Sequence, residues 1–107
     1  MAEMAQMAAT IGGSRTFSDG VKITWTPSTT KNSVELEVSI GGETVWQQEV
    51  QGDGTARIGV SGDNYKLSGS LSVKFGSGGT TGQVRAEGLE WTVQGDSHSY
   101  SGVVGTW

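Results

Sequence analysis

Cysteine is absent from this chain, proline and histidine each occur once, and no apolar run is long. The lack of cysteine excludes disulfides, thiolate metal sites and cysteine nucleophiles. A single histidine then leaves only oxygen ligands for a metal, so no metal or other cofactor is expected. No stretch approaches the roughly 20 apolar residues of a membrane-spanning helix, so no transmembrane span is expected either. The stability of the fold must therefore come from its buried core.

Basic residues are also scarce. The 107 residues carry 7 Lys and Arg against 11 Asp and Glu, a net charge of −4. Such a chain has no basic surface for nucleic acid or for an anionic membrane, so membrane contact would need apolar or headgroup-specific interactions. Its length suits one small domain.

The first residues, "MAEMAQMAAT", have neither the basic start nor the apolar run of a secretory signal. We therefore predict no signal peptide, which leaves a cytoplasmic or a non-classically secreted protein open. Met1, Met4 and Met7 are spaced three apart, which suits a short helix, but we favour a frayed terminus. We divide the chain into an N-terminal segment, 1–16, and one β-domain, 17–107.

From Val21 onward, apolar and polar residues alternate and turn residues recur about every ten positions, which indicates an antiparallel all-β domain. Trp25 and Trp91 fall on apolar faces and are expected in the core. Gly69 should bend a long strand, and the change of phase at Gly88 predicts a tight turn or a bulge. We expect a small Greek-key β-sandwich or flattened barrel of about eight strands. The expected strands are 21–26, 33–40, 44–50, 55–60, 65–75, 83–86, 89–94 and 98–107.

A Val-x-Gly-Asp pattern recurs three times, at "VQGDG", "VSGDN" and "VQGDS". Gly tolerates positive φ and Asp bonds nearby backbone, so the pattern predicts turns. The alternative is a calcium site built from Asp53, Asp63 and Asp96. Because Asp53 and Asp63 lie at opposite ends of one expected strand, we favour turns.

The only histidine lies in "GDSHSYSG", between an aspartate and several serines. On a strand, Asp96, His98 and Tyr100 share one face and the serines take the other, so His98 cannot activate a neighbouring serine. Glu35 and Glu37, roughly 7 Å apart on a strand face, match an inverting glycosidase pair but also an ordinary solvated face. We predict a binding protein rather than an enzyme.

Two tryptophans are less determined by the pattern. Trp46 and Trp107 suit either the core or an exposed aromatic surface, which would stack on a sugar or hold a lipid headgroup.

The stretch "ETVWQQEVQGDGTARI", with the later "GSGGTTGQVRAEGLEWTVQGDSHSY", resembles the fungal fruit-body lectins, whose β-sandwich is similar to that of the actinoporin cytolysins. The shared features are a Thr-Val-Trp strand, a glycine turn, a Ser-Gly-rich loop and a His-to-Tyr ending. The resemblance implies a lectin for galactose- and N-acetylgalactosamine-type glycans. It implies that three loops meet at one edge of the sandwich to bind the glycan. Their residues are Gly52, Asp53 and Gly54; Ser77 and Gly78; and His98 with Tyr100, beside Asp96.

Three hypotheses follow. The first is a non-enzymatic, lectin-like module that binds a glycan through these loops. The second is a membrane-active protein of the same architecture that binds lipid headgroups and uses the N-terminal segment as an inserting or oligomerising helix. The third is a structural protein that assembles as a homo-oligomer.

Overall fold

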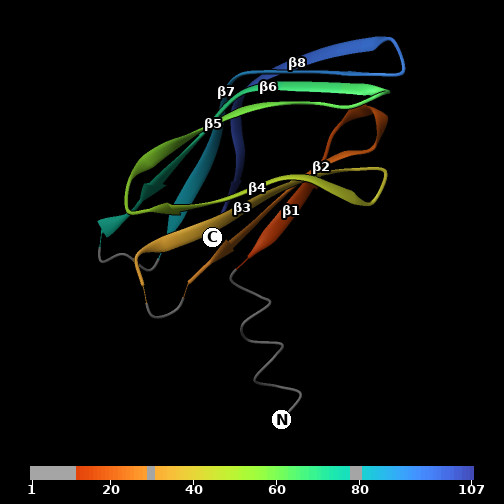
Figure 1. Cartoon of the computed structure of the whole chain (residues 1–107). Coiled ribbons are helices and arrows are strands. Elements are labelled where there is room, and N and C mark those ends of the chain that lie inside the picture. The colour runs from red at the N-terminus through yellow and green to blue at the C-terminus, as the bar shows by residue number, and fades with distance from the viewer. Residues whose placement is uncertain (1–11, 29–30, 78–80) are drawn as a thin grey trace.

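The computed structural model describes residues 12–28, 31–77 and 81–107. The chain folds into two four-stranded antiparallel sheets, as the alternation predicts (Figure 1). The first sheet contains β1 (Gly13–Thr16), β2 (Val21–Pro27), β3 (Ser33–Ile40) and β4 (Glu43–Gln51), with a one-turn helix, η1 (Ser18–Gly20), between β1 and β2. The second contains β5 (Gly54–Ser61), β6 (Tyr65–Phe75), β7 (Gly82–Val93) and β8 (Asp96–Thr106).

The connectivity corrects the expected Greek key. The strand orders are β1-β2-β3-β4 and β5-β6-β7-β8, so each sheet is a simple meander in which every strand pairs with its sequence neighbour. A Greek key instead returns its fourth strand to the side of the first. Short turns such as Gly41–Gly42, both at positive φ, let each strand fold directly back on the one before it.

Two strand assignments also change. Residues 13–16, assigned above to the N-terminal segment, form β1, which pairs with β2 from Gly13↔Trp25 to Thr16↔Lys22. The two expected strands at 83–86 and 89–94 form the single strand β7. The possible methionine helix falls on residues 1–11, outside the described part of the chain.

The prediction of a turn or bulge at Gly88 is confirmed, and a second irregularity of strand register occurs at Gly69. The β7–β8 register shifts between Ala86 and Leu89, and the β6–β7 register shifts between Ser68 and Ser70. Gly69 and Gly88 have φ values of 125° and 61°, which glycine adopts at little cost. The second sheet can therefore bend around the core.

The core lies between the sheets and consists of alternate side chains from both. Trp25 and Trp91 are buried, as predicted. Trp46 and Trp107 are partly buried and pack against this core. The largest fully buried side chains are Ile23, Leu36, Leu67, Leu71 and Leu89.

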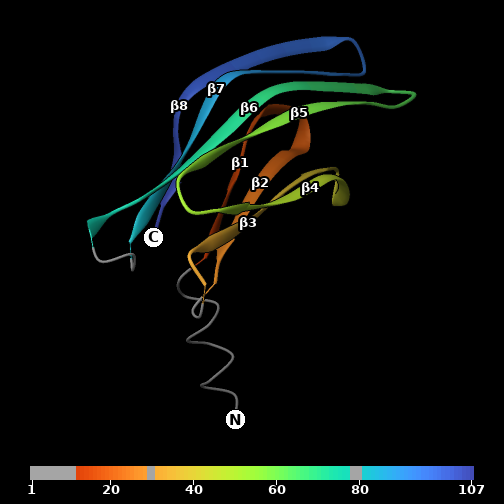
Figure 2. The ribbon, with the colours of Figure 1, turned by 60° about the vertical axis from the view of Figure 1, so that its left-hand side comes forward.

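The turns divide between two opposite ends of the sandwich. One end holds η1 and the turns β3–β4, β5–β6 and β7–β8, which lie together at the right of Figure 1. The opposite end holds the connections β2–β3, β4–β5 and β6–β7. Figure 2 shows the same division after rotation. We call the first the mouth end and the second the far end. No helix among the described residues has the length and apolar character needed to cross a membrane.

Candidate functional site

The three loops suggested by the lectin resemblance do not meet. Gly52, Asp53 and Gly54 lie at the β4–β5 turn and Ser77 in the β6–β7 connection, both at the far end, whereas Asp96 begins β8 at the mouth end. Because β7 runs the length of the sandwich, the connections before and after it lie at opposite ends. The expectation of one binding edge is therefore wrong. Gly78 lies outside the described residues.

The two far-end loops are joined by a bond that supports the fold. Asp53 Oδ1 accepts a hydrogen bond of 2.8 Å from the backbone N–H of Phe75, at the end of β6. The ring of Trp107 meets Phe75 edge-on at 5.6 Å, and its backbone exchanges two hydrogen bonds with Gly82. Asp53 therefore joins the β4–β5 turn to the end of β6. Trp107 joins the chain after β8 to the end of β6 and the start of β7.

His98 and Tyr100 share one face of β8, as predicted, but this face turns toward the first sheet. His98 Nε2 lies 2.8 Å from Asp19 Oδ2 in η1, and the imidazole lies 5.7 Å from the Trp91 ring. Phe17 contacts Tyr100 with ring centroids 5.1 Å apart. Both predicted site residues therefore help to join the two sheets.

Arg15 completes this junction. Its guanidinium donates to Tyr100 Oη at 3.0 Å and to the Val103 carbonyl at 2.9 Å. It also lies 4.9 Å from the centre of the Phe17 ring and 4.8 Å from that of Tyr100, within the range of cation–π attraction. We call Arg15, Phe17, Asp19, His98 and Tyr100 the edge clasp. It fastens β1 and η1 to β8.

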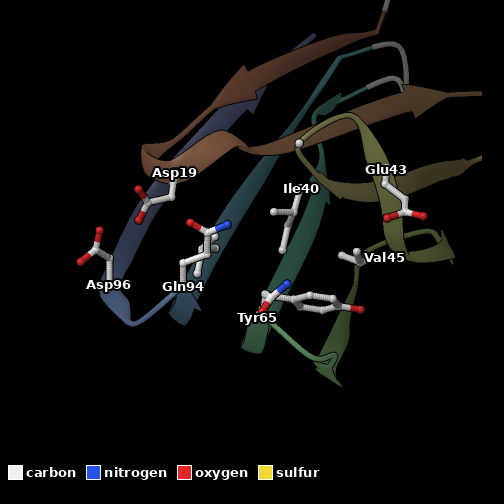
Figure 3. Close-up of a pocket in the computed structure, with 10 residues that line it drawn as sticks. Asp19, Ile40, Glu43, Val45, Tyr65, Gln94 and Asp96 are labelled. Carbon is white, nitrogen blue, oxygen red and sulfur yellow. The ribbon is translucent and has the colours of Figure 1, made fainter.

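A cavity of about 460 Å³ opens between the sheets at the mouth end. We call it the mouth (Figure 3). Apolar and aromatic side chains from both sheets face it: Ile40 and Val45 from the first, Tyr65 and Val93 from the second. All four are half-buried, so the mouth exposes the edge of the core. The remaining lining residues are Asp19, Gly41, Glu43, Asn64, Gln94 and Asp96.

Polar side chains surround this apolar floor. Figure 3 shows Asp19 and Asp96 on one side of the mouth and Glu43 on the other. Asn64 and Gln94 add two amides, and none of the ten lining residues is Lys or Arg. Carboxylates accept hydrogen bonds, whereas amides both donate and accept. The mouth can therefore bind a ligand that has an apolar face and several hydroxyl or amino groups.

Backbone bonds hold the rim in place. The N–H of Gln94 donates to the Asn64 carbonyl at 2.8 Å, which joins the two turns of the second sheet. The N–H of Gly41 donates to the Gly20 carbonyl at 3.2 Å, which joins η1 to the β3–β4 turn. Each half of the rim is thus anchored within its own sheet.

Sequence reasoning found Asp96 but missed most of the mouth. Glu43, Asn64, Tyr65 and Gln94 each lie within three residues of a turn glycine. The parity of successive strands would have placed their turns at one end. The shared calcium site of Asp53, Asp63 and Asp96 does not form, since Asp53 lies at the far end. No three His, Asp or Glu side chains within 12–28, 31–77 and 81–107 are placed to share a metal ion.

Comparison of the chain with protein-family models, curated proteins and solved structures gives no significant match. The resemblance to the fruit-body lectins therefore rests on the short motifs quoted above.

Proposed function

We propose that this chain is a non-enzymatic carbohydrate-binding module that holds a short saccharide in the mouth. The observation that carries the proposal is the combination, in one cavity, of an exposed core edge with a rim of acceptor and amide side chains. Sugars combine an apolar C–H face with a ring of hydroxyls, so they need both kinds of surface at once.

Tyr65 supplies the aromatic surface on which the apolar face of the sugar would stack. Its ring is half-buried at the start of β6 and lies beside Val45 in Figure 3. Gly62 packs against the ring, because a Cβ at Gly62 would lie 2.9 Å from Tyr65 Cζ. A ring held in this way offers a fixed apolar surface at low entropic cost.

The polar side is supplied by Asn64, Gln94, Asp96 and Glu43, all at or beside turns. The side-chain carboxylates of Glu43 and Asp96 accept no hydrogen bond from another residue within the described ranges. Their oxygens are available to sugar hydroxyls. A cavity of about 460 Å³ also falls within the usual size range of small-ligand sites.

The test is a glycan screen on the full chain, followed by titration of the best hits by NMR. We expect chemical-shift changes at Tyr65 and Gln94, with binding reduced at least threefold by Asn64→Ala and by Gln94→Ala, because each removes an amide from the rim. Ser77→Ala, at the far end, is the matched control and should bind normally.

Binding that is lost in Ser77→Ala but retained in both rim variants would place the glycan at the far end. That result would overturn the mouth as the site. A screen without hits would overturn the carbohydrate proposal itself.

A further inference from the structure

The charged side chains at the turns of the mouth end are all acidic. Each of the four connections at this end contains one carboxylate or is followed directly by one, and none contains Lys or Arg. The carboxylates are Asp19 in η1, Glu43 at the start of β4, Asp63 in the β5–β6 turn and Asp96 at the start of β8. These residues are 20 or more positions apart in the chain. Only the meander topology gathers them at one end of the sandwich.

The cations of the adjoining strands do not line the mouth. Arg15 in β1 is bound to Tyr100 Oη and to the Val103 carbonyl in the edge clasp. Lys22 and Lys66 are the second residues of β2 and β6, and both are exposed. Each follows a residue that faces the interior, Val21 or Tyr65, so its own side chain extends from the outer face of its sheet. The ammonium groups therefore point away from the cavity.

Among the four carboxylates, only Asp19 has a partner in the described part of the chain. His98 Nε2 approaches it at 2.8 Å, whereas Glu43, Asp63 and Asp96 form no ion pair there. Two of these three line the mouth. Their negative potential is not cancelled locally, and the apolar floor beside them reduces its screening by water.

We infer that the saccharide bound in the mouth is cationic, namely an amino sugar with a free amine. This inference rests on the proposed carbohydrate function and narrows its ligand class. An ammonium group gains attraction to Asp96 and Glu43 that a neutral hydroxyl does not, and it donates hydrogen bonds to the same oxygens. An N-acetylated sugar loses this attraction, and a uronic acid is repelled by the rim.

The experiment compares three ligands of equal length on the full chain: a glucosamine oligosaccharide, its N-acetylated form and a uronic acid oligosaccharide. Titrations are run at one pH at which the amine is protonated, at low and at high salt. We expect the amino sugar to bind about 10-fold tighter than the N-acetylated sugar at low salt, and this advantage to shrink as salt screens the charges.

Two rim variants and one control assign the effect to the mouth. Asp96→Asn and Glu43→Gln should each weaken amino-sugar binding roughly threefold and leave binding of the N-acetylated sugar unchanged. Glu49→Gln removes an exposed carboxylate from β4 outside the mouth lining and should alter neither. An equal loss in Glu49→Gln would mean that net charge acts on binding, and would overturn the inference.

The remaining outcomes separate the two proposals. Equal affinity for the amino and N-acetylated sugars, without salt dependence, overturns the charge preference while carbohydrate binding stands. Binding of a simple alkylammonium ion as tightly as the amino sugar, with no saccharide in the screen binding better, overturns the carbohydrate function. Absence of binding by all three oligosaccharides overturns the charge preference, and in that case only a glycan screen without hits overturns the carbohydrate function as well.

Discussion

The imidazole of His98 and the carboxylate of Asp19 meet across the junction of the two sheets, with Nε2 2.8 Å from Oδ2. The residues are 79 positions apart in the chain, and Asp19 has a φ of 61°. A non-glycine residue in this region needs support from its surroundings. The contact thus belongs to the edge clasp, and His98, the most distinctive residue of the sequence, stabilises the fold.

Replacement of His98 should therefore affect stability before binding. We expect His98→Ala to lower the free energy of unfolding by about 0.5–1 kcal/mol, since the contact is partly exposed to solvent. Urea denaturation measures this loss, with Ser99→Ala on the opposite face of β8 as the control. Saccharide binding should persist in both variants. A His98→Ala protein of normal stability that no longer binds would restore His98 as a ligand-binding residue.

Arg15 should be the strongest single member of the edge clasp. Arg15→Ala removes the hydrogen bonds to Tyr100 and Val103 as well as both ring contacts. We expect a loss of about 1–2 kcal/mol in unfolding free energy, together with faster amide hydrogen exchange in β1 and β8. Lys22→Ala, an exposed cation on β2, is the control. Unchanged exchange in β1 would contradict the role assigned to the clasp.

Gly69 should tolerate no side chain. A Cβ there would lie 2.6 Å from the Gly88 carbonyl oxygen and 2.7 Å from Leu89 Cα, and the φ of 125° disfavours other residues. We expect Gly69→Ala to cost about 3 kcal/mol or more.

Gly59 offers a matched control for this substitution, because it lies in the neighbouring strand β5 and a Cβ there meets nothing within 4 Å. Gly59→Ala should be neutral or slightly stabilising. Thermal unfolding of the two variants side by side measures the difference, and equal melting temperatures would refute the strain argument.

Asp53 should support the far end without taking part in binding. Asp53→Ala removes the acceptor for the Phe75 N–H, with an expected cost of about 1 kcal/mol. NMR shifts should change around Phe75 and Trp107, and saccharide affinity should remain that of the parent chain. A parallel loss of affinity would return the binding site to the β4–β5 turn.

Local sequence patterns predict much of the fold. The alternation of residues such as Val34, Leu36 and Val38 determines which side chains face the core, because the side-chain direction in a strand depends only on the position along it. The bends at Gly69 and Gly88 follow from breaks in the same alternation. The four residues of β1 show no such alternation, because Gly13 is half-buried and the other three are exposed. The sequence pattern therefore did not predict β1.

Local sequence patterns did not predict the mouth. The alternation and the turn residues were sufficient to predict the class of the fold, whether most side chains face the core or the solvent, and the positions of most turns. Three features emerged only from the folded chain: the two meanders, the cavity that Glu43 and Asp96 line, and the orientation of His98 and Tyr100 toward the opposite sheet. Strand periodicity is a property of neighbouring residues, whereas the loops that meet depend on which strands pair and on how the two sheets pack against each other.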